Sequence, residues 1–201
     1  MKRLITGFAV GALALTLFVP QVSSNYAFAA ETGVLVVVKD GKVNGTPVDQ
    51  YILEEVANGR ELSEVVSKLI DGGASAGDVV VAAIAAGISP ANAAGAVTKA
   101  VPAAALEAFK AAIAMAPEFA ADIAGAVTKA APNYAVEIVN AAIAAKPEST
   151  VEITQAVLNE VDAGQAAAIK KAAVDAVQNA NLDNSNVILN KIGDLNQASP
   201  S

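Results

Sequence analysis

Four carboxylates recur at every fifteenth position, and they are the residues of this chain best placed to do chemistry. They are Glu107, Asp122, Glu137 and Glu152. A row of carboxylates offers oxygen ligands to a cation or charge to a basic partner, and close carboxylates can share a proton. Two lysines, Lys99 and Lys129, recur at twice that spacing, each after a threonine. These six residues are the candidate binding residues of the sequence.

The remaining composition argues against catalysis. The chain has no His and no Cys, so it lacks the commonest general base, a thiol nucleophile and the usual zinc ligands. No Ser-x-x-Lys pattern is present to activate a serine. We therefore expect no catalytic residue, no cofactor and no metal site, and we predict that the protein is not an enzyme.

A proline repeat predicts the elements that position the candidate residues. Proline occurs with the same fifteen-position step, at Pro102, Pro117, Pro132 and Pro147, and the heptapeptide AGAVTKA at 94–100 returns at 124–130. Each proline inside one long helix would cost about 3 kcal/mol, so four would cost about 12 kcal/mol. That cost is comparable to the whole net stability of a domain, about 5–15 kcal/mol. A proline in the first turn of a helix has no such cost, because its missing N–H has no helical partner there. The sequence therefore predicts short antiparallel helices that restart at each proline.

The apolar pattern predicts which face of each helix is buried. Positions 3, 6, 7, 10 and 14 after the proline are mostly apolar, and spacings of three and four place them on one face. In the unit that starts at Pro117 they are Ala120, Ile123, Ala124, Val127 and Ala131. We predict an all-α fold, a short right-handed-type α-solenoid of ~15-residue antiparallel helices in which ~30-residue helix pairs repeat.

The helix pair resembles the short HEAT-like repeats of bacterial proteins in its length. Those repeats carry an early Arg and a Gly-Asp turn, and neither recurs in this chain. The resemblance therefore implies an architecture and no activity.

Six segments follow from these patterns. They are a cleaved signal peptide at 1–29, a β-hairpin segment at 30–46, a capping helix pair at 47–71, three helix-pair repeats at 72–161, a closing helix at 162–180 and a polar Asn-rich tail at 181–201. In the hairpin, strands at 34–38 and 42–44 flank an Asp40-Gly41 turn. Thr46, before Pro47, is the expected cap of the first helix. The tail is expected to add one or two helical turns, with 197–201 disordered.

The segment 1–29 has the pattern of an export signal. Lys2 and Arg3 precede an uncharged apolar run at 4–19, and Ala27-Phe28-Ala29 matches the small-x-small cleavage pattern. We expect export to the periplasm or exterior, with no stable membrane insertion after cleavage. Loss of the two basic residues changes the formal charge from −7 to −9. An acidic surface repels phosphate, so nucleic acid is not an expected partner.

Alternation of the helices predicts the arrangement of the carboxylates. Glu107 and Glu137 should lie on one side of the stack, with Asp122 and Glu152 on the other. Neighbours on one side should be about 16–20 Å apart, if two helix diameters separate them. That distance is too large for two carboxylates to share a proton or a metal, which favours a solvated polar stripe. Lys99 and Lys129 fall near helix C-termini, where the helix dipole favours a cation.

The favoured hypothesis is an exported, non-enzymatic helical-repeat protein that acts as a scaffold for a protein or peptide partner. The alternative is a structural subunit that associates with itself in a cell-surface or extracellular assembly, since the predicted strand offers an edge. A hydrolase or lyase that uses the carboxylates is the least favoured alternative.

Overall fold

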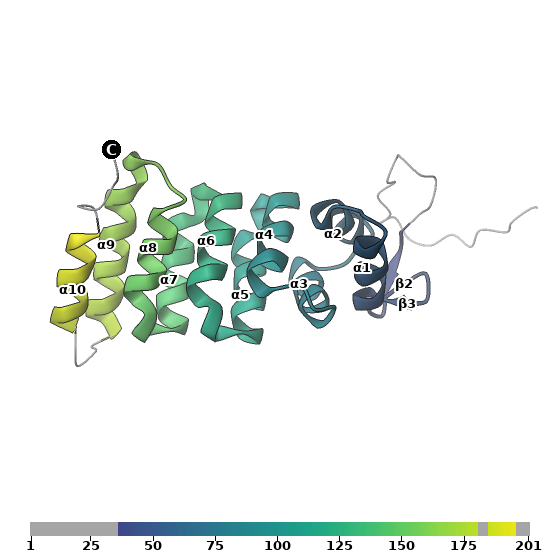
Figure 1. Cartoon of the computed structure of the whole chain (residues 1–201), viewed down its shortest axis with the longest axis horizontal. Helices are drawn as coiled ribbons and strands as arrows, with labels where there is room; N and C mark the ends of the chain where they lie inside the picture. Colours follow the sequence, from purple (N-terminus) through teal and green to yellow (C-terminus); the bar gives the residue numbers. More distant parts are fainter. Residues whose placement is uncertain (1–35, 181–184, 196–201) are drawn as a thin grey trace, which may run out of the picture.

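The computed structural model describes residues 36–180 and 185–195, and these residues are mostly helical, with a small antiparallel sheet at the N-terminal end (Figure 1). The described helices are α1 Val48–Ala57, α2 Leu62–Asp71, α3 Ala76–Ala85, α4 Pro90–Ala100, α5 Ala105–Met115, α6 Ala120–Ala130, α7 Ala135–Ala145, α8 Thr150–Leu158, α9 Ala163–Ala180 and α10 Ser185–Asp194. The strands are β1 Val38–Lys39, β2 Lys42–Val43 and β3 Thr46–Pro47, in the order β1-β2-β3.

Each periodic proline begins a short 3-10 turn that leads directly into an α-helix. The four turns are Pro102–Ala104, Pro117–Phe119, Pro132–Tyr134 and Pro147–Ser149. The residue before each proline is extended, with φ from −135° to −149° and ψ from 69° to 85°. The proline ring disfavours helical backbone in the residue that precedes it, so one extended residue ends a helix and redirects the chain. The prediction that the prolines restart the helices is confirmed.

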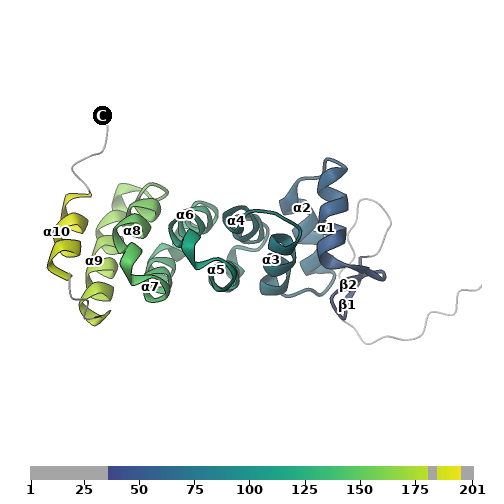
Figure 2. The ribbon, with the colours of Figure 1, turned by 60° about the horizontal axis from the view of Figure 1, so that its bottom comes forward.

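Each helix contacts its neighbour in the chain and also the helix two positions further on. The even-numbered helices contact one another in the series α2, α4, α6, α8 and α10, and the odd-numbered helices do so from α1 to α9. Figures 1 and 2 show the helices following one another along the longest axis of the molecule. The described part of the chain is therefore helical and repeat-like.

Glycine and alanine allow the even-numbered helices to approach closely. A Cβ added at Gly95 of α4 would lie 3.5 Å from the Cβ of Ala126 on α6. The same contact recurs one repeat later, where a Cβ at Gly125 would lie 3.6 Å from the Cβ of Ala156 on α8. Both distances are ordinary van der Waals contacts, so these positions have room for a methyl group and for little more.

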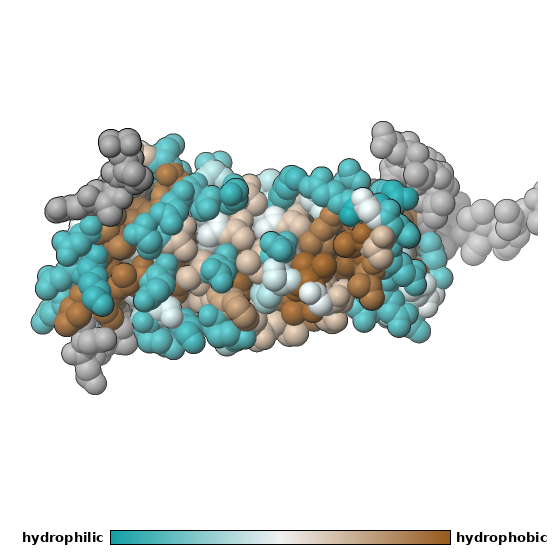
Figure 3. All heavy atoms as spheres, in the orientation of Figure 1, coloured by the Kyte–Doolittle hydropathy of each residue, from teal (hydrophilic) through white to brown (hydrophobic). Residues whose placement is uncertain are grey.

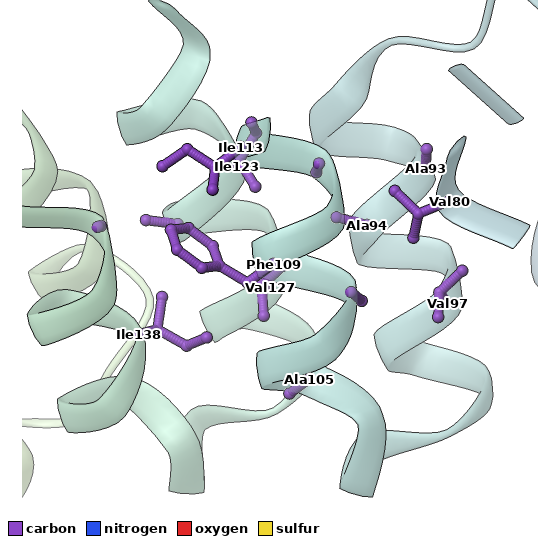
Figure 4. Close-up of a cluster of buried hydrophobic side chains, with 14 of the residues drawn as sticks. Val80, Ala93, Ala94, Val97, Ala105, Phe109, Ile113, Ile123, Val127 and Ile138 are labelled. Carbon is purple, nitrogen blue, oxygen red and sulfur yellow. The ribbon is translucent and has the colours of Figure 1, made fainter. Parts of the chain in front are cut away.

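The core follows the predicted apolar positions. The five predicted residues of the Pro117 unit are all buried, with Ile123 and Val127 fully so. Phe109 of α5 heads the fully buried side chains ranked by volume, and Figure 4 shows it among Ile113, Ile123 and Ile138. Many other core positions are alanines, so the helices are held by numerous small contacts between backbones that lie close together.

Two even-numbered helices, α4 and α6, each bury a threonine beside their apolar residues. The sequence pattern did not predict this burial. Thr98 and Thr128 are fully buried, and the hydroxyl of each lacks a hydrogen-bond partner within the described residues. Thr154 on α8 differs, because its hydroxyl donates to the carbonyl oxygen of Thr150 at 2.7 Å. A buried hydroxyl without a partner costs about 1–3 kcal/mol of desolvation.

The N-terminal sheet confirms the predicted turn and corrects the predicted strand number. Asp40 and Gly41 have φ of 52° and 71°, as a two-residue hairpin turn requires, and Lys39 pairs with Lys42. Asn44 and Gly45, with φ of 51° and 97°, make a second such turn. The chain therefore returns as β3 in a three-stranded sheet, whereas we expected a two-stranded hairpin. The first strand is also shorter than the predicted 34–38, because β1 begins only at Val38; residues 36–37 are not in a strand, and 34–35 lie outside the described residues.

The expected cap of α1 is also wrong. Thr46 lies in β3, Pro47 is the N-cap residue, and α1 has no side-chain cap. The second positive-φ turn accounts for this difference, because it brings Thr46 back alongside Val43 before the helix begins. Pro47 is tolerated there, since an edge strand does not need its N–H.

The sheet is fixed to the ends of the first helices. The N–H of Val38 donates to the carbonyl oxygen of Gly72 at 2.9 Å, and the N–H of Val48 donates to that of Gly41 at 3.1 Å. A Cβ at Gly72 would lie 2.7 Å from the carbonyl oxygen of Val36, so only glycine fits at this contact. Val43 is 2% exposed and joins the helical core.

The C-terminal segment contains more helix than we expected. The predicted tail of one or two turns includes α10, a ten-residue helix that packs on α8 and α9 and buries Ile188 and Ile192. The signal peptide at 1–29 and the predicted disorder at 197–201 lie outside the described residues. Among the described helices, none combines the length and the apolar character that a membrane span requires.

Candidate binding surface

The four periodic carboxylates lie exposed in the first turns of α5, α6, α7 and α8. A negative charge there is favoured by the helix dipole, which explains their recurrence without a ligand. Glu107 and Glu137 fall on odd-numbered helices, and Asp122 and Glu152 on even-numbered helices, as predicted. Within the described ranges, no group of three or more Asp, Glu, His or Cys residues could hold a metal ion.

The packing contradicts the helix separation from which we predicted the carboxylate spacing. α5 contacts α7 directly, and α6 contacts α8 directly, so one helix-to-helix distance of about 8–10 Å separates their axes. Our value of about 16–20 Å assumed two intervening helix diameters. The sequence indicates the alternation of the helices, but it does not say that helices two apart touch.

Glu107 has a structural role that distinguishes it from the other three carboxylates. Its Oε1 accepts a hydrogen bond from the N–H of Gly77 at 2.8 Å. Gly77 lies in the first turn of α3, where N–H groups have no partner inside the helix. Glu107 therefore caps a helix that precedes it by one full helix-pair repeat.

The two candidate lysines also make contacts within the chain. The Nζ of Lys99 lies 2.6 Å from the Oε1 of Glu61, the residue before α2, and the Nζ of Lys129 lies 3.8 Å from the Oε2 of Glu160, after α8. The hydrogen bond from Lys99 lowers the pKa of Glu61, and a second hydrogen bond from Ser63 lowers it further. Both lysines are largely exposed, so each pair adds little stability.

Open grooves lie toward both ends of the described part. The C-terminal groove, between α7 and α9, has a volume of about 690 Å³. The N-terminal groove, between β1, the start of α1, and α3, has a volume of about 420 Å³. Both volumes fall in the range of ligand pockets, about 300–1,000 Å³. Figure 3 shows hydrophobic residues gathered over α1 and α3 and again over α9 and α10.

The grooves differ in charge. The C-terminal groove is lined by apolar residues such as Val136 and Ile143, and its Lys171 and Asp175 pair with each other at 2.5 Å. The N-terminal groove is lined by Val48, Val79 and Val81 together with aspartates. Those aspartates are Asp40, Asp49 and Asp78. The second groove therefore presents one sign of charge beside an apolar surface.

Sequence reasoning missed both grooves. The three aspartates are separated by up to 38 positions in the chain, and they line one groove only because the sheet packs on α1 and α1 packs on α3. None of the six candidate binding residues lines either groove.

Tyr51 of α1 is not a base near neutral pH. Burial raises the pKa of its phenol, the charge of Glu55 raises it further, and the charge of Arg60 offsets part of the shift.

Comparison with known protein families, with curated proteins and with solved structures found no match to this chain. The functional conclusion therefore depends on the chain and its own geometry.

Proposed function

We propose that this chain is an exported, non-enzymatic helical-repeat protein that acts as a binding scaffold for a protein or peptide segment. Its helices would form a short α-solenoid, an architecture that displays extended surfaces. The observation that carries this proposal is the pair of open grooves, each built from several elements and lined at least in part by apolar residues. Such grooves suit the side chains of a bound segment better than they suit catalysis without His or Cys.

Two backbone features favour this function over self-association through the sheet. The Val38 N–H of β1 already donates to Gly72, and β3 ends in Pro47, which has no N–H. Both edges therefore have fewer free backbone groups for pairing with another strand. On this basis the protein is a monomer, and light scattering across a wide concentration range should give a constant monomer mass.

Groove-filling variants test the scaffold function. A display library of short random peptides is selected against the full chain, and the affinities of the selected peptides are measured by calorimetry. Ala82→Trp fills the N-terminal groove, Ala144→Trp fills the C-terminal groove, and Ala103→Trp is the matched control, on an exposed residue outside both. One groove variant should weaken binding at least tenfold, and the control should not. Absence of peptide binding, or equal binding by all three variants, would contradict the proposal.

Export has its own test. The N-terminal sequence of the protein recovered from outside the cytoplasm of a bacterial host should begin at Ala30, after the Ala27-Phe28-Ala29 pattern. Full-length protein that stays in the cytoplasm would contradict export while leaving the scaffold function untouched.

A further inference from the structure

We infer that the N-terminal groove binds a protein segment in which Lys or Arg side chains flank aliphatic side chains. This inference rests on the proposed scaffold function and names the chemistry of the partner at one groove. Its basis is the shape of the groove, the distribution of charge around it, and the contrast with the C-terminal groove.

The groove has three walls that belong to different elements. The β1–β2 turn contributes Asp40, the start of α1 contributes Val48 and Asp49, and α3 contributes Asp78 and Val81. Val79, fully buried, lies in its lining, and Val81 is 39% exposed. The apolar contact area for an aliphatic side chain therefore comes mainly from exposed Val81 and its neighbours Ala82 and Ala85 on α3, over a floor of buried valines.

The charged residues that line the groove are all acidic. Each wall carries one aspartate, and no Lys or Arg lines the groove. None of the three carboxylates forms an ion pair with a Lys or Arg in residues 36–180 and 185–195. Lys39 and Lys42 line a separate hollow on the hairpin, which shares Asp40 with this groove. A concave surface with one sign of charge and apolar walls concentrates the field, so it attracts ligands of the opposite charge.

Local structure explains why an aspartate is tolerated at each of the three positions. It does not explain why all three aspartates line the same groove. Asp40 has the positive φ of a hairpin turn, and Asp49 and Asp78 occupy the first turns of α1 and α3. In the C-terminal groove the single acidic residue, Asp175, is paired with Lys171. The N-terminal groove has no such internal partner among the described residues, and this difference favours an occupant of opposite charge.

A second copy of the chain fits this groove less well than a basic partner. The chain has 20 acidic and 13 basic residues, a formal charge of −7, so two copies repel each other at long range. The occupant is therefore a segment of another protein, with basic and aliphatic side chains close together.

Fluorescence anisotropy with defined peptides tests the inference on the full chain. The probe is a labelled ten-residue peptide of alternating Val and Lys, and its counterpart of alternating Val and Glu is the negative control. Asp40→Asn, Asp49→Asn and Asp78→Asn are combined, because Asn retains the turn and helix-start preferences of Asp while removing the charge. The matched control combines Glu64→Gln, Glu118→Gln and Asp194→Asn, which are exposed and lie outside both grooves.

The groove variant should bind the Val-Lys peptide about tenfold or more weakly, since each lost charge contact removes up to about fivefold in affinity. The control triple variant should change the affinity by less than twofold. Val81→Ser, which changes no charge, should also weaken binding, because it removes apolar contact. Unfolding curves of all variants confirm that each is folded.

Four results would overturn the inference. They are equal losses in both triple variants, equal binding of the Val-Glu peptide, complete displacement of the peptide by millimolar spermidine, and dimerisation of the free chain through this groove. If the library peptides use the C-terminal groove while Val-Lys peptides do not bind, the inference fails and the scaffold function stands. If no peptide binds at all, both fail.

Discussion

Replacement of Phe109 by alanine should cause a large loss of stability, and replacement of Phe119 should cause a small one. The two residues lie ten positions apart in adjacent repeat units, but Phe109 is fully buried and Phe119 is 45% exposed. Phe→Ala in a well-packed core costs about 3–5 kcal/mol. Phe109 belongs to a core in which many of the buried residues are alanines, and an alanine has no rotamer with which to fill a cavity. We therefore expect a loss of about 4–5 kcal/mol for Phe109→Ala.

The expected loss for Phe119→Ala follows from its exposure. A phenylalanine side chain buries at most about 200 Å². Roughly half of that area is buried at Phe119, so its loss should lower the free energy of unfolding by about 1–2 kcal/mol, after allowing for the alanine that remains. Urea unfolding followed by circular dichroism gives the free energy of unfolding of both variants. Hydrogen exchange should accompany it, because repeat proteins can unfold in parts. An equal or larger loss for Phe119→Ala would refute the described packing of α5 against α6 and α7.

Five further substitutions test individual contacts. Gly125→Ala should stabilise the protein by up to about 1 kcal/mol through helix propensity. Gly125→Leu should destabilise it, because the Cβ already lies in contact with Ala156 at 3.6 Å and the remaining leucine atoms have no room. Melting temperatures of both variants measure this difference. Thr128→Val should raise the free energy of unfolding by about 1 kcal/mol, because it removes a buried hydroxyl that has no hydrogen-bond partner. Thr154→Val should not raise it, because the hydroxyl that it removes donates a hydrogen bond. A reversed order of the two variants in urea unfolding would contradict the described burial. Glu107→Ala should cost about 1 kcal/mol and should increase hydrogen exchange at the first turn of α3, and unchanged exchange there would contradict the capping contact.

The sequence was sufficient to predict the helical part because two independent patterns coincide in it. The prolines mark each helix start, and the apolar spacing marks each buried face, so an error in one pattern would conflict with the other. Ile123 and Val127 illustrate the agreement, since both occupy predicted positions and both are fully buried. The two local signals at Asp40-Gly41 and Asn44-Gly45 have the same chemistry, but we read only the first as a turn.

The binding surface could not be predicted in the same way. The candidate residues were chosen because they recur, and recurrence follows from the repeat itself and from the helix dipole. The grooves arise where the repeat ends, at the junction of the sheet with α1 and α3 and beside the long helix α9. Asp40 and Asp78 have no relation in the sequence that would bring them together. Such a site depends on tertiary packing, so periodicity carries no information about it.

The most direct test of stacked short helices is the stability of Pro117→Ala. Pro117 begins a 3-10 turn at the start of a helix, where its fixed φ lowers the entropy of the unfolded chain. Urea unfolding should therefore show a loss of up to about 1 kcal/mol in the variant. If Pro117 instead interrupted a continuous helix, its removal would stabilise the protein by about 3 kcal/mol, and that result would contradict the structure described above.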